Sequence, residues 1–196
     1  MKILILNGSP RPKGSVTKIL SEVTSNLKNK FKVENVNVYN LNIKPCVGCR
    51  GCRRNEGTCV LKEDDAHEIG HKINEADAVI IGSPTHFNNM SSPLKALLDR
   101  NGATLFAETS MLPKSLHKGK PAMIVTACMS PKFLDVLLGM SRGTIKNIKL
   151  YLKYGGFKIV GNIVKTGTEK STDLDLRLIK KIDSQCKKLE RKLSAA

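Results

Sequence analysis

Continuous apolar runs alternate with segments of helical periodicity along this chain, and that alternation restricts the fold more than any other feature. In four runs the apolar residues are continuous rather than alternating, as in parallel strands that are buried on both faces. A fifth run has the weaker pattern of a strand at the edge of a sheet. In chain order, the predicted strands are Lys2–Leu6, Val33–Tyr39 (the edge strand), Ala78–Ile81, Ala122–Thr126 and Phe157–Val164.

Between these runs, apolar residues recur every three or four positions, which predicts amphipathic helices. The helical segments are Val16–Leu27, Ala66–Ala76, Pro93–Arg100, Ile145–Leu152 and Ile179–Leu193. Strands that alternate with helices predict an α/β fold with a doubly wound parallel sheet and helices on both faces. The 196 residues show no internal repeat or low-complexity linker, so we expect a single domain over residues 1–196.

The charge balance favours anionic partners. Lys and Arg number 33 against 17 acidic residues, a formal net charge of +16, which suits phosphate-bearing cofactors, acidic proteins or nucleic acid. The basic residues are dispersed and aromatic residues are few, so nucleic-acid binding is not expected, although a basic binding module without enzymatic activity remains an alternative. The apolar run at the N-terminus is shorter than a signal sequence, and no run is long enough to cross a membrane. We therefore expect a cytoplasmic protein.

The loop after the first strand predicts an anion site. It runs from Asn7 to Thr17 and leads into a helix, whose first backbone amides would face a bound anion, with Arg11 and Lys13 adding positive charge. The loop is not a Walker motif, because five residues separate Gly8 from Gly14 and no lysine follows, and G-x-G-x-x-G is absent. The alternative is an ordinary strand-to-helix turn that binds nothing.

The loops after the third and fourth strands predict a site for a flat ring. Pro84 stiffens the first of them, and His86 and Phe87 offer flat surfaces at the carboxyl end of a strand. The second loop, residues 126–130, would face it, because ligands of doubly wound sheets bind beyond the carboxyl ends of the strands. A phosphate site beside a ring site predicts a cofactor that resembles a mononucleotide.

Three segments, Ile3–Thr17, Ala76–Phe87 and Met90–Arg100, resemble the FMN-dependent NAD(P)H oxidoreductases of the flavodoxin-like superfamily. The resemblance implies a flavodoxin-like five-stranded sheet of order 2-1-3-4-5, and homodimers or homotetramers in which a neighbouring subunit closes the flavin cleft. It implies that the FMN phosphate is bound by Ser9, Arg11, Ser15, Val16 and Thr17. It further implies that the isoalloxazine ring is held by Pro84, Thr85, His86, Phe87, Asn88, Thr126 and Ala127.

Four of the six cysteines fall within a stretch of 14 residues, inside a cysteine-rich insert at about residues 44–62. They are Cys46, Cys49, Cys52 and Cys59. Their consecutive two-residue gaps match the leading part of an iron–sulfur ligand run, whereas structural zinc sites more often use two separated pairs. A loop without a metal is the remaining alternative. The pattern resembles the compact motif of the iron-sulfur flavoproteins, a branch of the same family. That resemblance implies one [4Fe–4S] cluster near the flavin.

The segment His67–His71 matches H-E-x-x-H, the signature of zinc proteases. On a helix, however, Ala66, Ile69 and Ile73 share one face, so His67 and His71 are predicted to face solvent on the other. We therefore do not expect protease activity.

The expected function is an FMN-containing electron-transfer oxidoreductase with a [4Fe–4S] cluster. Electrons would pass from a reduced carrier through the cluster to FMN and on to a small acceptor such as a quinone, oxygen or peroxide. The donor would be reduced ferredoxin or NAD(P)H, and no catalytic side chain is assigned because the cofactors carry the chemistry. The alternative is a cluster-free NAD(P)H-dependent FMN or quinone reductase.

Overall fold

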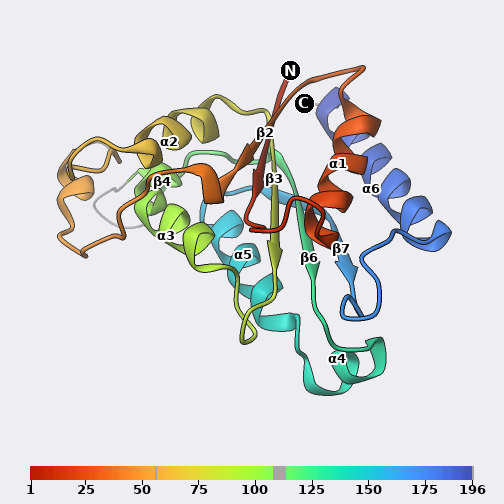
Figure 1. The fold of residues 1–196 in the computed structure, drawn as a ribbon. Coiled ribbons are helices and arrows are strands. Elements are labelled where there is room, and N and C mark those ends of the chain that lie inside the picture. The colour runs from red at the N-terminus through yellow and green to blue at the C-terminus, as the bar shows by residue number, and fades with distance from the viewer. Residues whose placement is uncertain (56, 108–113, 196) are drawn as a thin grey trace.

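A five-stranded parallel sheet forms the centre of the molecule (Figure 1). The structure, a computed structural model, describes residues 1–55, 57–107 and 114–195. The strand order is β2-β1-β3-β6-β7, which confirms the predicted order 2-1-3-4-5 of a flavodoxin-like sheet. The strands are β1 (Lys2–Asn7), β2 (Lys32–Asn37), β3 (Ala78–Pro84), β6 (Pro121–Ala127) and β7 (Lys158–Lys165).

Helices cover both faces of the sheet, as the alternation of patterns predicted. Two helices, α1 (Ser15–Leu27) and α6 (Leu176–Ser194), pack side by side on one face. The other face is covered by α2 (Asp65–Glu75), α3 (Ser92–Arg100) and α5 (Arg142–Tyr154).

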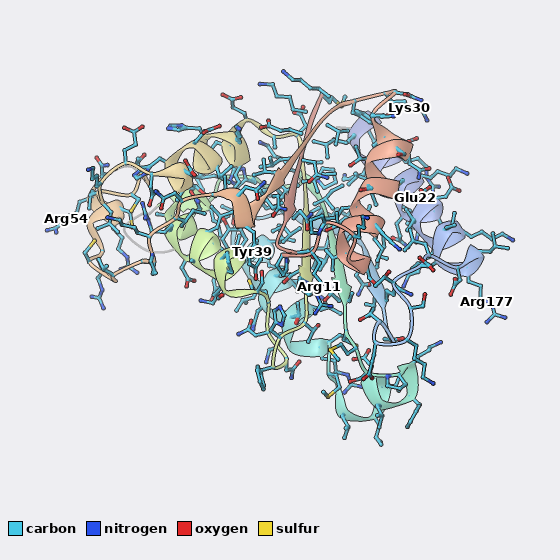
Figure 2. All side chains as sticks on the ribbon, viewed as in Figure 1. Arg11, Glu22, Lys30, Tyr39, Arg54 and Arg177 are labelled. Carbon is cyan, nitrogen blue, oxygen red and sulfur yellow. The ribbon has the colours of Figure 1, made fainter. Side chains whose placement is uncertain are left out.

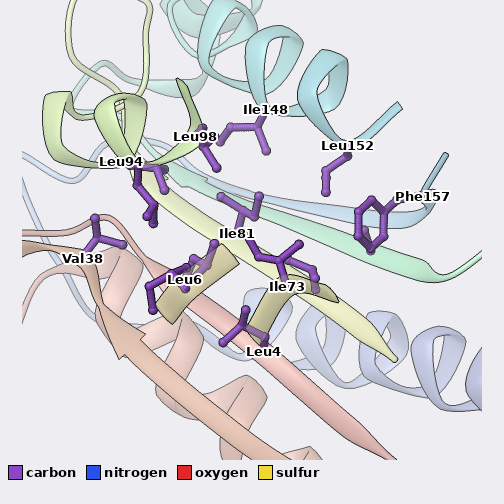
Figure 3. Packing of buried hydrophobic residues seen from close by; sticks show 14 of the residues in the cluster. Leu4, Leu6, Val38, Ile73, Ile81, Leu94, Leu98, Ile148, Leu152 and Phe157 are labelled. Atoms are coloured by element: carbon purple, nitrogen blue, oxygen red, sulfur yellow. The ribbon is translucent and has the colours of Figure 1, made fainter. Parts of the chain in front are cut away.

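Each strand of the sheet interior contributes to two hydrophobic cores. In β1, Leu4 and Leu6 pack on the side of α2, α3 and α5, where Figure 3 shows them near Ile73 and Ile81. Ile3 and Ile5 pack on the side of α1 and α6. Successive side chains of a strand point to opposite faces, so a strand buried on both faces requires an unbroken apolar run. This explains why continuous apolar runs identified the central strands β1, β3 and β6. The expectation of a doubly buried strand at residues 157–164 was wrong, because β7 is the other edge of the sheet and most of its residues are only half-buried.

Several short elements were not predicted. The edge strand ends at Asn37, whose side chain accepts a hydrogen bond of 3.0 Å from the Tyr39 amide and turns the chain into the 3-10 helix η1 (Val38–Asn40). The other short elements, whose apolar patterns are too brief to recognise, are η2 (Gly51–Arg54), η3 (Gly102–Thr104), β4 (Phe106–Ala107), β5 (Lys114–Ser115) and α4 (Lys132–Leu138).

The sheet brings four connecting loops to one edge. In the strand register, Asn7 of β1 lies beside Gly82 of β3, and Ala127 of β6 lies between Pro84 and Lys165 of its two neighbours. The carboxyl ends of β1, β3, β6 and β7 therefore meet, and the loops that follow them enclose a common space. Among the described residues, no helix has the length and apolar character needed to cross a membrane.

Candidate functional site

A pocket of about 150 Å³ lies at this edge, between the β1–α1, β3–α3, β6–α4 and β7–α6 loops. It contains eight of the twelve residues predicted to bind a flavin, from three loops that lie far apart in the sequence. These eight residues are Ser9, Arg11, Ser15, Val16, Pro84, Thr85, His86 and Ala127.

The β1–α1 loop is held in shape by its own polar groups. The Ser9 amide donates to Asn7 Oδ1 at 3.0 Å, and the carbonyl of Arg11 accepts from the Gly14 amide at 3.0 Å and from Thr17 Oγ1 at 2.9 Å. The predicted phosphate ligand Thr17 thus supports the loop and does not line the pocket. Gly14 leaves the first turn of α1 without a side-chain cap, and that turn carries no acidic residue. Its amides suit an anion.

The Ser15 hydroxyl is a buried polar group without a partner. Ser15 is 5% exposed, and within the described part of the chain its Oγ makes no hydrogen bond. A buried donor that stays unsatisfied costs about 1–3 kcal/mol, so such a group is rare unless a ligand completes it. Ser15 lines the pocket at the helix N-terminus. This unsatisfied hydroxyl fits the oxygen of a phosphate group.

The β3–α3 and β6–α4 loops form the other wall. Thr85 continues the sheet ladder, because its amide donates to the Ala127 carbonyl at 2.8 Å. The predicted ring contact Thr126 is fully buried behind it, with its Oγ1 3.2 Å from Thr85 Oγ1, and does not line the pocket. Thr144 of α5 donates to the same Thr85 hydroxyl at 3.2 Å. Side chains behind the wall thus fix the rotamer of Thr85.

Phe87 and Asn88 form the tip of a tight turn outside the pocket. The backbones of His86 and Asn89 pair with each other, and the two residues between them have φ of 45° and 59°, as in a two-residue hairpin loop. Phe87 is fully exposed, and Asn88 Oδ1 accepts from the Gly143 amide of α5 at 2.6 Å. Neither residue lines the pocket. Left-handed backbone at two non-glycine residues is strained, and such strain clusters at functional sites.

Six pocket residues were not among the twelve predicted ones: Pro10, Gly14, Cys128, Met129, Thr168 and Thr172. The first four lie in loops that the sequence analysis placed at the site, so only the two threonines were missed altogether. The two threonines lie in the β7–α6 loop, which carries no recognisable motif. The only available signal was that this loop follows a strand whose carboxyl end lies at the ligand-binding edge. Burial, with a smaller contribution from Asp135, raises the pKa of Cys128 to about 11. The Cys128 thiol therefore stays protonated at neutral pH.

The cysteine segment, residues 46–59, lies beside α2 and α3, and Figure 2 shows Arg54 projecting from its outer end, away from Arg11. Cys46 and Cys49 are exposed, and Cys52 and Cys59 are half-buried. Burial raises the pKa of Cys52, and the nearby thiolates of Cys59 and Cys46 raise it further.

The four thiols fit an iron–sulfur centre in their chemistry, because clusters are held by thiolates and a cation relieves repulsion between them. Their positions in space, however, do not form a ligand set. Among the described residues, no three His, Cys, Asp or Glu side chains lie close enough together to hold a metal ion.

A buried arginine, Arg100, anchors this segment to the body of the protein. Its side chain is fully buried and forms a two-point ion pair with Asp64, with distances of 2.6 and 3.0 Å from Nη1 and Nη2 to the two carboxylate oxygens. Arg100 Nη1 also donates to the Lys44 carbonyl at 2.8 Å, and Nε donates to Cys59 Sγ at 3.2 Å. Arg100 therefore contacts both ends of the cysteine-rich insert.

The prediction that both histidines of H-E-x-x-H face solvent was wrong for His67. Its side chain is only 11% exposed. The ring accepts a hydrogen bond of 3.2 Å from the Asp64 amide in a capping box, and its Nε2 lies 3.0 Å from the Cys59 carbonyl. The insert folds back over the first turn of α2 and covers it, which helical periodicity alone does not indicate. His71, one turn later, is exposed.

The strand order and the ligand pocket at the carboxyl edge place this protein in the class of flavodoxin-like α/β proteins. The chain belongs to the NADPH-dependent FMN reductase family, whose family model matches residues 1–142.

Comparison with individual proteins agrees with this family. The chain is 37% identical over 102 residues to an iron-sulfur flavoprotein of Methanocaldococcus jannaschii, a match that covers 52% of each chain. It is 27% identical over 195 residues to an iron-sulfur flavoprotein of Clostridioides difficile, covering 98% of this chain and 77% of that one. The match spans about half the length of most of these curated relatives.

A solved structure shares the fold. The FMN-dependent NADH-azoreductase of Bacillus anthracis, in complex with FMN, superposes with a TM-score of 0.67 at 18% identity and covers 99% of this chain and 98% of that one.

Proposed function

We propose that this protein is an FMN-containing electron-transfer oxidoreductase that also carries a [4Fe–4S] cluster. The observation that carries the proposal is the pocket at the carboxyl edge. Two of its features suit a bound anion: the Ser15 hydroxyl, which has no partner among the described residues, and the uncapped first turn of α1. The family match supports FMN as the occupant.

In this proposal the β1–α1 loop holds the FMN phosphate. Ser9, Arg11, Ser15 and the amide of Val16 would bind it, since all four residues line one end of the pocket. The isoalloxazine ring would lie against the other wall, formed by Pro84, Thr85, His86 and Ala127. When bound, FMN supplies the ability to accept and release one or two electrons, and the protein supplies position and electrostatics.

The cluster would be held by Cys46, Cys49, Cys52 and Cys59. Support comes from their thiol chemistry, their spacing in the sequence and the names of the relatives, several of which are iron-sulfur flavoproteins. We propose that the exposed basic side chains of the insert, Arg50, Arg53, Arg54 and Lys62, attract an acidic donor such as reduced ferredoxin.

We also propose that the protein acts as a homodimer or homotetramer. The pocket of about 150 Å³ is smaller than the roughly 300 Å³ at which sites for drug-sized ligands begin, which supports a cleft that is completed by another chain. The missing wall would come from a second subunit. Large apolar side chains are exposed on and around α4, next to the pocket residue Met129; they are Phe133, Val136, Leu137, Leu138 and Met140. Such patches mark interaction surfaces.

Anaerobic purification followed by a visible spectrum and by iron and sulfide assays tests the proposal. We expect flavin bands and a broad iron–sulfur shoulder that dithionite bleaches. Flavin without iron would identify the cluster-free reductase, and a colourless protein that takes up no added FMN would leave only a basic binding module. In the variant Cys49→Ser the shoulder should disappear while the flavin bands remain.

A further inference from the structure

Cys59 differs from the other three cysteines in the contacts of its sulfur. Its Sγ accepts a hydrogen bond from Arg100 Nε at 3.2 Å, and its carbonyl lies 3.0 Å from His67 Nε2. Cys46 and Cys49 lie on the exposed part of the segment. One cysteine of the four is therefore fixed by the body of the protein, while the segment before it extends outward.

The cost of burying Arg100 indicates that its position matters. Its side chain has no exposed surface, and a guanidinium without water requires full compensation by its partners. Of its five N–H groups, Asp64 takes two, the Lys44 carbonyl takes one, and Nε–H points at the Cys59 sulfur. A neutral thiol is a weak acceptor and would be a poor partner for this donor. A cluster-bound thiolate would be a strong one.

We infer that Arg100 is a positioning residue for the cluster: it holds Cys59 in place as the anchored ligand and raises the cluster's reduction potential through its hydrogen bond to that sulfur. The inference rests on the proposed function, since it requires a cluster on these cysteines. Hydrogen bonds to cluster sulfurs and nearby positive charge both stabilise the reduced, more negative state. Asp64 moderates the effect, because its carboxylate draws two N–H groups of the same guanidinium.

Two substitutions should move the potential in opposite directions. Arg100→Lys keeps the charge but replaces the rigid fork of donors by a single ammonium group, so the bonds to Cys59 and Asp64 are no longer made together. We expect the midpoint potential of the cluster to become more negative. Asp64→Asn leaves Arg100 in place without its carboxylate partner, and asparagine still caps a helix. We expect the potential to become more positive.

Each variant has a matched control. Arg54→Lys makes the same exchange at an exposed position of the insert. Asp65→Asn removes one carboxylate from the same helix turn, but Asp65 accepts from the Asn42 amide, at 2.6 Å, and not from Arg100. Both controls should shift the potential much less than their partners. The midpoint potential of FMN, measured in the same titration, should stay nearly constant in all four variants.

The measurement is a spectroelectrochemical titration of the holoprotein, followed at the iron–sulfur shoulder and the flavin bands. Should Arg100→Lys lose its iron or fail to fold, the comparison of Asp64→Asn with Asp65→Asn decides the question alone. Equal cluster potentials in Asp64→Asn, Asp65→Asn and wild type, with iron fully bound, would overturn the role of Arg100 and leave the proposed function intact. Wild-type protein that holds FMN without iron would overturn both.

Discussion

Lys18 and Asp173 form an ion pair of 2.6 Å that joins the first turn of α1 to the loop before α6, 155 residues later in the chain. The same Lys18 ammonium donates to Thr172 Oγ1 at 3.0 Å. Thr172 also lines the pocket, so this contact joins the β7–α6 loop to the start of α1 beside the proposed phosphate site.

Thr172→Val should therefore weaken FMN binding. Loss of one hydrogen-bonding group costs about 1 kcal/mol, or roughly a fivefold increase in Kd. Riboflavin has no phosphate, so its Kd should change less, and Thr172→Ser, which keeps the hydroxyl, should bind FMN like wild type. Quenching of flavin fluorescence on titration of the apoprotein measures all three. If Thr172→Val binds FMN with unchanged affinity, the β7–α6 loop has no part in the phosphate site.

Ser15→Ala should have a larger effect on FMN binding. The Ser15 hydroxyl has no partner within the described residues, and a hydrogen bond to a charged phosphate contributes about 1.5–3 kcal/mol, or roughly 10- to 100-fold in Kd. Without ligand, the variant should be at least as stable as wild type, because it removes an unsatisfied buried donor.

The same fluorescence titration, together with thermal unfolding of the apoprotein, checks both expectations for Ser15→Ala. Ser21→Ala, on the exposed surface of α1, is the control. A variant that is less stable as apoprotein yet binds FMN normally would show that the Ser15 hydroxyl has a structural role.

Acid should weaken the anchor of the cysteine segment. Burial alone would raise the pKa of Asp64, but hydrogen bonds from Arg100 and from the amides of Lys44 and Ala66 hold it below its ordinary value. A carboxyl group whose pKa is lowered on folding stabilises the protein above its unfolded pKa, about 3.9, and this stabilisation is lost as the pH falls through the folded pKa.

Asp64→Asn should therefore be less stable than wild type by about 2 kcal/mol at pH 6, with the difference closing below about pH 4. Urea unfolding of the metal-free proteins at several pH values measures the difference, and Asp65→Asn serves as the control. A difference that persists unchanged at pH 3 would mean that the Asp64 charge does not stabilise the fold.

Cys128 should react slowly with alkylating agents although it lines the pocket. Its pKa is about 11, chiefly because it is buried, so only about one Cys128 side chain in a thousand is a thiolate at pH 8. For an ordinary cysteine with a pKa of about 8.5, the thiolate fraction at this pH is roughly a quarter. Mass spectrometry of the metal-free protein after a short exposure to iodoacetamide should find Cys46 and Cys49 modified before Cys128. Rapid alkylation of Cys128 would contradict its buried state.

The sequence allowed the fold to be predicted, together with eight of the fourteen residues that line the pocket, for a physical reason. Strands buried on both faces need unbroken apolar runs, and parallel strands bring their carboxyl ends to one edge, so Ser15 and His86 were placed together from their positions after two strands.

Contacts between distant segments could not be predicted. Arg100 ends a helix, where a cation usually interacts favourably with the helix dipole in solvent, and only tertiary packing against Asp64 and Cys59 buries it. Thr172 lies in a loop without a motif. The seven residues of α4 are too few for a recognisable helical stripe.

The exposed surface of α4 provides the last prediction. Leu137 is 74% exposed, and α4 follows the pocket residue Met129 in the chain, so we expect a subunit that covers this helix to contact the pocket as well. Full burial of a leucine contributes about 1.5–3 kcal/mol, so Leu137→Glu should weaken self-association by at least roughly tenfold and raise the Kd for FMN with it. Lys132→Glu, on the same helix, changes charge without removing apolar surface and is the control. Light scattering coupled to size exclusion gives the mass of each variant. If Leu137→Glu keeps the wild-type mass, α4 is not the interface, and if it becomes monomeric yet binds FMN as before, the second subunit does not complete the pocket.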